Sequence, residues 1–280
     1  MTLAGVDARS VRGRLQLHAE RDESGRTVLA SRVHEGSFHL SKSYWDGHAL
    51  LVQWVNPTAG VFAGDVMESD VKVGPGASLL VTTPSATRIH TRFSAEQAAG
   101  MQYQRFQVAA GGWLEVQPEW LIPQRGSAFR QETVIEAEEG GGLFYAELLA
   151  PGRVAHGEAL EFDELDLRLR MTFGGKLIVQ ERLHATPERM WPLGDGKGAP
   201  LFVGTVLLCY PNAAREIVNV ARTCLQQHAE CQSGISAISV HTVSLRLVAY
   251  SSIPLRHALK ALRAALAEVM PPLRCEMRKL

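Results

Sequence analysis

A short segment near residue 60 combines residue types that bind ions or shape turns. Residues 56–65 read NPTAGVFAGD and follow an apolar stretch typical of a buried strand. Gly60 and Gly64 precede an acid, Asp65, so the segment suits three roles: a loop that holds a phosphate, a tight turn, or a turn that presents a carboxylate. Each role implies a different kind of protein.

The chemistry of this segment disfavours phosphate binding. A P-loop has four residues between its glycines, followed by Lys and Ser or Thr, because these side chains meet phosphate and magnesium. Here three residues separate the glycines, and the charge of Asp65 would repel phosphate. No G-x-G-x-x-G follows a strand elsewhere, and GPG at 74–76 is typical of a turn. Nucleotide chemistry is therefore not expected.

A second candidate site lies in residues 82–92, TTPSATRIHTR, where Ser85 is close in sequence to His90. The G-x-S-x-G motif of α/β-hydrolases is absent, but a Ser–His pair remains an open alternative. The favoured interpretation is that the hydroxyl groups of this segment satisfy backbone groups where a strand meets a turn.

The potential metal ligands are scattered along the chain. Histidines occur at positions 34, 39, 48, 90, 156 and 184 without H-E-x-x-H, and the four cysteines form no C-x-x-C pair. Six acids could line a polar passage or loosely receive a cation: Asp65, Glu68, Asp70, Glu115, Glu119 and Glu158. This spacing predicts no permanently bound metal and identifies no metal ligand.

The charge balance limits the classes of partner. Lys and Arg number 29, as do Asp and Glu, so no charge excess favours a nucleic acid or an anionic membrane. The start of the chain lacks the apolar core of a secretory signal, and no window reaches the roughly 18 apolar residues of a membrane span. A cytoplasmic location is expected.

From residue 66 onward the sequence alternates with period two and is interrupted by glycine turns, as half-buried strands are. The last glycines of these turns are separated by 36, 30 and 33 residues: Gly76, Gly112, Gly142 and Gly175. A lone hairpin cannot bury its apolar face, whereas stacked units can. The pattern predicts a mainly β fold, either β-helix-like or a layered stack of antiparallel hairpins. An irregular antiparallel sandwich is the alternative.

Two helices are expected in the C-terminal third. The first starts near Asn212 as N-cap, and the second starts near Ser252 and ends before Pro271. Their apolar stripes are expected to pack on the chain's own sheet. Cys209 is predicted in a strand core and Cys224 on the apolar face of the first helix. The basic side chains opposite the second stripe are expected to face solvent: Arg256, Lys260 and Arg263.

Several blocks, in order, resemble the UreD family of urease accessory proteins, called UreH in some organisms. Residues 56–65 are similar to its N-P-x-x-G-x-x-x-G-D block, and 82–90 to T-T-x-x-A-T-[KR]. Residues 114–131, LEVQPEWLIPQRGSAFRQ, are similar to a block in which two prolines flank an apolar stretch. Residues 148–162, LLAPGRVAHGEALEF, are similar to its G-R-x-x-x-G-E element.

The resemblance implies a chaperone, not an enzyme, required to assemble the nickel metallocentre of urease. It implies one UreD-like domain over residues 1–280, with a β-helix-like fold and a few helices. The implied partners are the urease apoprotein and UreF, which recruits the GTPase UreG. No cofactor is expected to stay bound, and Ni²⁺ is expected to pass transiently along an internal passage to the urease active site.

The matched blocks also suggest site residues. Those assigned to the signature and a possible nickel passage are Asp65, Glu158, Thr82, Thr83, Thr87 and Arg88. Those assigned to turns are Asn56, Gly60, Gly64, Pro118, Pro123, Arg153 and Gly157. The hypothesis is that Asp65 and Glu158 line or shape a route for Ni²⁺, because transient transfer needs weak, exchangeable oxygen ligands. An Asp that only accepts N–H groups of its turn is equally open.

Two other classes of protein remain as alternatives. The first is a β-scaffold hydrolase that uses His90 with Ser85 or a nearby acid. The second is an interaction module unrelated to urease, with the 252–270 helix as its contact surface.

Overall fold

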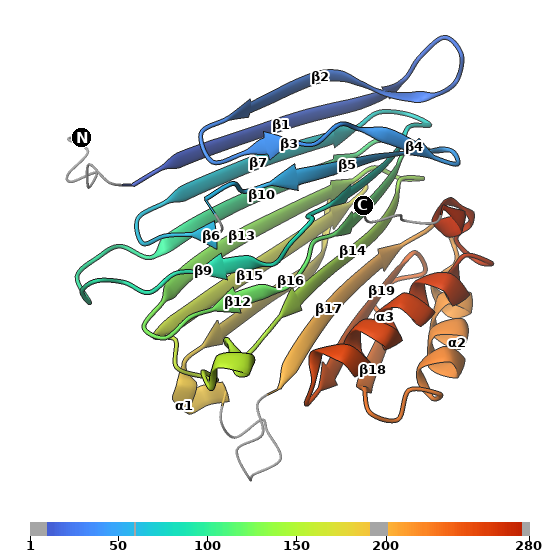
Figure 1. The fold of residues 1–280 in the computed structure, drawn as a ribbon. Coiled ribbons are helices and arrows are strands. Elements are labelled where there is room, and N and C mark those ends of the chain that lie inside the picture. Colours follow the sequence, from blue (N-terminus) through green and yellow to red (C-terminus); the bar gives the residue numbers. More distant parts are fainter. Residues whose placement is uncertain (1–9, 59, 191–200, 276–280) are drawn as a thin grey trace.

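The computed structural model describes residues 10–58, 60–190 and 201–275, and two β-sheets that face each other dominate it (Figure 1). The first sheet contains β1 (Arg12–Arg21), β2 (Thr27–Glu35), β7 (Val66–Val73), β10 (Gly100–Val108), β13 (Ala128–Ala137), β15 (Glu164–Phe173) and β16 (Lys176–Ala185). Its order is β16-β15-β13-β10-β7-β1-β2.

The second sheet contains β3 (His39–Leu40), β5 (Ala49–Val55), β8 (Ser78–Thr82), β11 (Trp113–Gln117), β14 (Gly142–Leu149), β17 (Phe202–Cys209), β18 (Gln232–Ala237) and β19 (Thr242–Ala249). Its order is β18-β19-β17-β14-β11-β8-β5-β3, and β4 (Tyr44–Asp46) pairs with β5. A narrow third ladder, joined to the second sheet where β12 pairs with β14, consists of β6 (Gly60–Val61), β9 (Thr87–Ile89) and β12 (Leu121–Pro123).

The middle of the chain winds in coils through these sheets. One coil passes through β7, β8 and β9, the next through β10, β11 and β12, and the third through β13 and β14. Equivalent strands of successive coils pair in parallel, with Phe106 opposite Val71 on one side and Ile135 on the other. The predicted mainly β, β-helix-like architecture is confirmed.

The glycine turns connect the two sheets, which corrects the expected pairing of their strands. Turns at 74–76, 111–112 and 140–142 each lead from the first sheet to the second. These turns also stack, because Gly142 N–H donates to the Gly112 carbonyl at 2.9 Å. Only the turn at Gly174 and Gly175 closes an antiparallel hairpin, between β15 and β16. The strands joined by the other three turns instead pack their apolar faces together across the core.

Apolar side chains from both sheets fill the space between them. Phe106 and Phe129 of the first sheet and Leu79 and Tyr145 of the second are almost fully buried. Each strand contributes alternate residues to this core, as its period of two requires. Cys209 belongs to the same core, as predicted.

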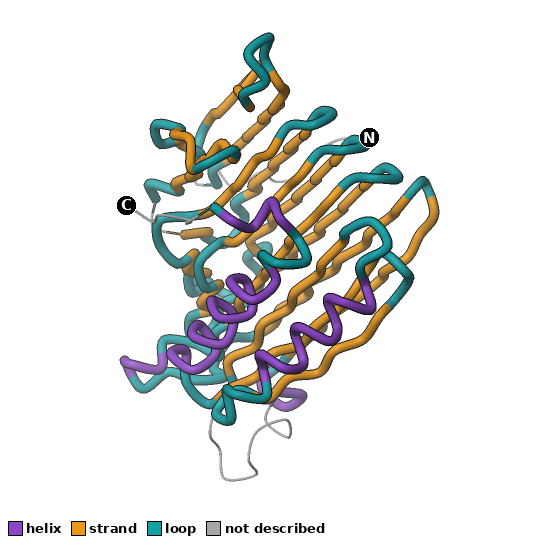
Figure 2. Tube along the Cα trace, turned by 90° about the vertical axis from the view of Figure 1, so that its right-hand side faces the viewer, coloured by secondary structure: helices purple, strands orange, loops and turns teal. Residues whose placement is uncertain are grey.

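Two helices cover the outer face of the second sheet (Figure 2). They are α2 (Ala214–Leu225) and α3 (Ser252–Leu266), and a one-turn helix, α1, spans Pro187–Met190. Short 3-10 helices lie at Val154–His156 and Pro271–Arg274. The prediction that both apolar stripes pack on the chain's own sheet is confirmed. Among the helices of the described ranges, none combines the length and apolarity needed to cross a bilayer.

Four details of these helices differ from expectation. Asn212 has a φ of +53° and precedes the helix by two residues, so it is not the N-cap. Ser252 is the first helical residue, and the extended Ser251 precedes it. Cys224 is partly exposed and is not among the buried residues of α2.

The fourth difference concerns one residue of the basic face of α3. Arg256 and Lys260 are exposed as predicted, but Arg263 lies against β11 with only 11% of its side chain exposed. Arg263 donates from Nη2 to Glu115 Oε2 at 2.9 Å, and Arg256 donates from Nη2 to Glu119 Oε2 at 2.7 Å. Helical spacing shows which residues share a face, but it cannot show that acids far away in sequence lie opposite them.

Candidate functional site

Most of the residues suggested by the family blocks lie along the narrow third ladder. We call this region the signature edge and define it as residues 56–58, 60–65, 82–90 and 118–123. Here β6 pairs in parallel with β9, and β9 with β12. Pro118 follows β11, Pro123 ends β12, and Arg88 is exposed on β9.

Asn56 and Gly60 fold the first part of the signature edge onto its neighbour. Asn56 donates from Nδ2 to the Gly60 carbonyl at 2.6 Å and accepts the Thr58 N–H at 3.0 Å. Gly60 has a φ of +150°, and a Cβ there would lie 2.2 Å from the Arg88 carbonyl oxygen. Only glycine allows the two backbones to approach so closely.

Asp65 is buried, with both carboxylate oxygens bound to backbone. Its Oδ1 accepts the Val11 N–H at 2.8 Å, and its Oδ2 accepts the Phe62 N–H at 2.9 Å. Gly64 before it has a φ of +82°, in the left-handed region that glycine favours. These contacts match the turn-holding interpretation of Asp65, in which the carboxylate satisfies N–H groups that would otherwise lack acceptors.

Two buried threonines join the signature edge to the next coil. Thr82 donates from its hydroxyl to the Gln117 carbonyl at 2.6 Å. The hydroxyl of Thr83 accepts the Glu119 N–H at 2.8 Å. Both threonines therefore satisfy backbone groups at the end of a strand, as the hydroxyl-rich sequence suggested.

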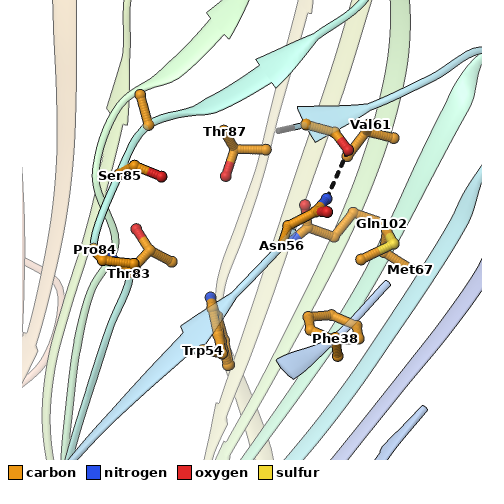
Figure 3. Close-up of a pocket in the computed structure, with 12 residues that line it drawn as sticks. Phe38, Trp54, Asn56, Val61, Met67, Thr83, Pro84, Ser85, Thr87 and Gln102 are labelled. Atoms are coloured by element: carbon orange, nitrogen blue, oxygen red, sulfur yellow. Dashed lines mark hydrogen bonds between the residues drawn. The ribbon is translucent and has the colours of Figure 1, made fainter. Parts of the chain in front are cut away.

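A small cavity lies beneath the signature edge (Figure 3). Its volume is about 40 Å³, room for one or a few water molecules. We call it the signature cavity, and its lining includes Asn56, Gly60, Thr83, Thr87 and Gln102. The structure thus brings four of the suggested residues together, joined by Gln102 of β10.

Glu158 lies on a separate turn and is held by arginine. Arg153 donates from Nε to Glu158 Oε2 at 2.8 Å and also pairs with Oε1, and the Arg125 N–H approaches Oε2 at 3.4 Å. The bond from Arg153 lowers the pKa of Glu158 below its ordinary value. Gly157 ends the preceding 3-10 helix with a φ of +74°.

The two residues of the hydrolase alternative have different surroundings. Ser85 lines the signature cavity beside Thr83 and Thr87. The ring of His90 stacks on Phe62, with 4.1 Å between the ring centroids and 7° between the planes.

The acids considered for a polar passage do not converge. Glu68 and Asp70 line a hollow on the outer face of the first sheet, while Glu115 and Glu119 pair with the arginines of α3. Within residues 10–58, 60–190 and 201–275, no three His, Cys, Asp or Glu residues are grouped as a metal site.

A second polar region, which the sequence interpretation missed, runs between the two sheets. We call it the interior track and define it as Gln104, Gln131, Thr133, Tyr145 and Glu147. Thr133 donates to Gln104 Oε1 at 3.1 Å, and Gln131 Nε2 approaches the Thr133 hydroxyl at 3.3 Å. Gln131 also donates to Glu147 Oε2, which accepts the Tyr145 hydroxyl at 3.1 Å.

Glu147 is the acid of the interior track, and its bonded partners there are neutral. Burial raises its pKa, because few polar groups replace the water that would stabilise the charged form. Burial also raises the pKa of Tyr145, and the nearby Glu147 adds to that effect. A proton or an arriving cation would each relieve the cost of this buried charge.

The track opens into a cavity at the edge between β16 and β17. The cavity has a volume of about 250 Å³, and its polar lining includes Gln131, Glu147, Thr205, Glu181 and Arg246. Glu181 and Arg246 form an ion pair between the two sheets, with both side chains partly exposed. We call this the lateral cavity.

Gln102 and Gln104 connect the two polar regions. They are two residues apart on β10, so their side chains share one face of the strand about 7 Å apart. Polar side chains therefore extend from the signature cavity through the track to the lateral cavity. Amide, hydroxyl and carboxylate oxygens of this kind can hold a hard or borderline cation weakly.

The signal for the interior track was present in the alternation of two strands. In β13 the inward positions include Gln131 and Thr133 between apolar ones, and in β14 Glu147 interrupts an otherwise apolar strand. Inward polar residues are informative because burying them costs free energy unless they find partners.

Comparisons with known proteins point to one family. A family model described as "UreD urease accessory protein" matches residues 11–278. A protein of Opitutus terrae named "Urease accessory protein UreD" is 40% identical over 272 residues, which cover 96% of this chain and 98% of the relative. A protein of Acetivibrio thermocellus with the same name is 27% identical over 89% of this chain and 95% of its own.

Proposed function

Because this chain belongs to the UreD family of urease accessory proteins, we propose that it acts as a chaperone in the assembly of the nickel metallocentre of urease. In this proposal it is a cytoplasmic protein without catalytic activity. It brings the urease apoprotein together with UreF and, through UreF, with UreG. Its cargo is Ni²⁺, which it holds only in transit, and it keeps no permanent cofactor.

The observation that supports a guiding role is the continuous series of polar side chains between the sheets. The series begins at the signature cavity, passes along the interior track and ends at the lateral cavity. Elsewhere the space between the sheets is filled mainly by apolar side chains. A cation could move only where oxygen atoms replace part of its water shell, so we propose this series as its route.

The chemistry of Glu147 suits transit more than storage. Its carboxylate accepts bonds from neutral donors, and burial raises its pKa. An arriving Ni²⁺ would be held there by one carboxylate and neutral oxygens, a weak set that releases its ion easily. Clustered imidazole or thiolate ligands would hold a borderline cation tightly. The residues named for this route include no such cluster, which favours release of the ion.

We propose that Asp65 and Glu158 shape the mouth of this route and do not bind the ion. Asp65 already accepts two backbone N–H groups, and Glu158 is paired with Arg153. Thr82, Thr83 and Thr87 would fix the neighbouring coil in the same way. Arg88, exposed on the same ladder, is available to partners of the chaperone.

A pull-down followed by an activity assay tests this function. The full chain is expected to associate with the urease apoprotein and with UreF, and to recruit UreG only when UreF is present. Urease expressed with nickel and the other accessory proteins should gain activity only when this chain is included. Failure of association, or full urease activity in its absence, would refute the proposal.

A further inference from the structure

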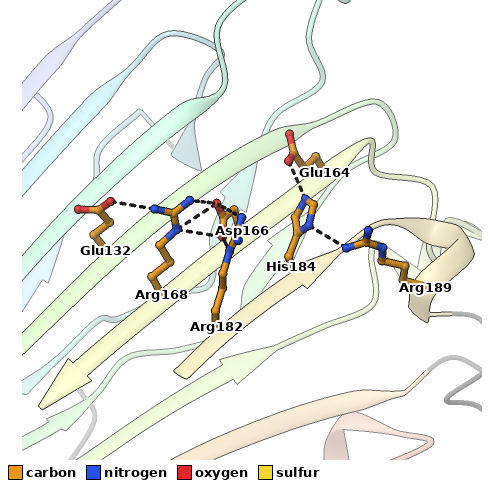
Figure 4. Close-up of polar contacts among 7 residues, drawn as sticks. All are labelled: Glu132, Glu164, Asp166, Arg168, Arg182, His184 and Arg189. Atoms are coloured by element: carbon orange, nitrogen blue, oxygen red, sulfur yellow. Dashed lines mark hydrogen bonds and ion pairs between the residues drawn. The ribbon is translucent and has the colours of Figure 1, made fainter. Parts of the chain in front are cut away.

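Two arginines on the outer face of the first sheet share a single buried carboxylate. Arg168 of β15 and Arg182 of β16 are direct cross-strand neighbours, where like charges repel each other. Both donate to Asp166 (Figure 4), Arg182 from Nε to Oδ1 at 2.7 Å and Arg168 from Nη2 to Oδ2 at 2.6 Å. The Asp166 side chain is 4% exposed, whereas those of Arg168 and Arg182 are 50% and 53% exposed.

Asp166 therefore acts as a positioning residue for two half-exposed guanidinium groups. The bonds from Arg182 and Arg168 hold the pKa of Asp166 far below its ordinary value, so it is ionised at neutral pH. Each arginine uses Nε and Nη2 on this carboxylate and directs Nη1 elsewhere. Since the side chains are already ordered, a ligand that binds them loses less conformational entropy.

The surrounding residues leave positive charge in excess. Three consecutive cross-strand rows of β13, β15 and β16 make up this surface, which we call the arginine patch. The rows are Arg130, Asp166 and His184; Glu132, Arg168 and Arg182; and Val134, Arg170 and Gln180. Four arginines thus face two carboxylates. Glu132 Oε1 lies 3.7 Å from Arg168 Nη1, a long ion pair between two half-exposed side chains that an incoming carboxylate would replace.

The surface of the patch also forms a hollow that is larger than a small anion. A hollow of about 840 Å³ is lined by three arginines, Arg168, Arg170 and Arg182, and by two acids, Glu132 and Glu181, with Val134 and Gln180 among them. Residues two apart on a strand are about 7 Å apart, and so are alternate side chains of an extended peptide. Arg168 and Arg170 thus match the spacing of acids at alternate positions of such a peptide.

We propose that the arginine patch docks an extended acidic segment of a protein partner. Its carboxylates would accept bonds from the Nη1 groups of Arg168 and Arg182 and from Arg170, as arginine forks bind carboxylates elsewhere. This docking goes beyond the nickel route, because the patch lies on the outside of the first sheet and shares no side chain with the interior track. Arg168 and Arg182 also line the lateral cavity, so the patch and the end of the route meet at this edge of the sheet.

Fluorescence anisotropy with fluorescein-labelled hexaglutamate and the full chain tests the proposal. The peptide should bind the wild type and dissociate as salt is raised, and hexalysine should not bind. Arg170→Gln and Arg182→Gln should each weaken binding about tenfold, the usual effect of losing one charge-assisted hydrogen bond. Arg14→Gln, which removes an exposed arginine from β1 of the same sheet, should leave binding within about twofold, because Arg14 lies outside the patch.

Circular dichroism of each variant checks the fold, and Arg170→Gln is the safer variant because Arg170 is exposed and away from Asp166. Unchanged hexaglutamate binding by folded Arg170→Gln and Arg182→Gln would overturn the proposal. Equal weakening by Arg14→Gln would show a general charge effect and would also overturn it. Displacement of the peptide by millimolar inorganic phosphate would assign the patch to small anions instead.

Discussion

The signature edge and the interior track both hold buried polar side chains, but the two regions use them differently. At the edge, Asp65, Thr82 and Thr83 bind backbone groups of other segments. In the track, Gln131 and Glu147 bind other side chains. Backbone partners stay in place while the protein is folded, whereas side-chain partners can rotate and exchange. The edge is therefore suited to holding the coils together, and the track to passing an ion.

The largest expected effect is on stability, at Asp65. Asp65→Ala leaves the Val11 and Phe62 N–H groups without their acceptor in a buried site. We expect the free energy of unfolding to fall by about 3 kcal/mol, because hydrogen bonds to a charged acceptor are lost and two donors are left unsatisfied. Chemical denaturation monitored by circular dichroism measures this change.

Asp163→Ala is the matched control. Asp163 is an acid with a side chain 47% exposed that pairs with Arg92 at the protein surface. Surface ion pairs contribute little, so the control should lose less than about 1 kcal/mol. Equal losses in the two variants would mean that Asp65 does not hold the signature edge.

A smaller effect, of opposite sign at Glu147 of the interior track and at Glu158 of the separate turn, is expected when the pH changes. Burial raises the pKa of Glu147, so its contribution to stability is complete below its ordinary pKa of 4.5 and is lost as pH rises through the raised value. Arg153 lowers the pKa of Glu158, so its contribution is present above 4.5 and is lost as pH falls through the lowered value.

Glu147→Gln and Glu158→Gln should therefore diverge from the wild type in opposite directions. At pH 8 we expect Glu147→Gln to be more stable than the wild type and Glu158→Gln to be less stable. Both differences should shrink toward acid pH, where the wild-type carboxyl groups become protonated. Urea denaturation across about pH 2 to 8 measures them, because the Glu158 contribution is lost only below its ordinary pKa of 4.5. If Glu147→Gln loses stability at pH 8, as Glu158→Gln is expected to do, the opposite effects assigned to these two acids would be contradicted.

Part of the fold could be predicted because it depends on local pattern. Strand alternation and the glycine period indicate stacked β units whether the turns close hairpins or join two sheets. Whether a turn closes a hairpin or joins two sheets depends on strand pairing between coils, such as that of Phe106 with Val71. A local sequence pattern does not show this pairing. The N-caps predicted at Asn212 and Ser252 were each wrong by one residue, because Ala213 and Ser251 precede the helices and helix ends are hard to place from local pattern.

The candidate site could be predicted only in part for the same reason. The motif located the signature edge, because Asn56 acts on Gly60 within a few residues, although the close approach of Gly60 to Arg88 could not be seen from the sequence. The interior track joins Gln131 and Glu147 from facing strands, and each looks like an ordinary polar residue in its own strand. Similarly, Glu115 was considered for a passage, but Arg263 lies 148 residues away in sequence and pairs with it.

The central claim is that Glu147 of the interior track, and not Asp65 of the signature edge, contacts nickel in transit. The most direct measurement is the nickel content of urease over time, by atomic absorption, in assembled complexes made with variants of this chain. We expect Glu147→Gln to slow loading roughly tenfold or more, the usual range when a metal-binding group is altered. Assembled complexes that contain Asp65→Asn should load urease with nickel at the wild-type rate. Complexes that contain the control Glu23→Gln, at an exposed residue, should do the same. Wild-type loading by Glu147→Gln, together with slow loading by assembled Asp65→Asn, would contradict the account.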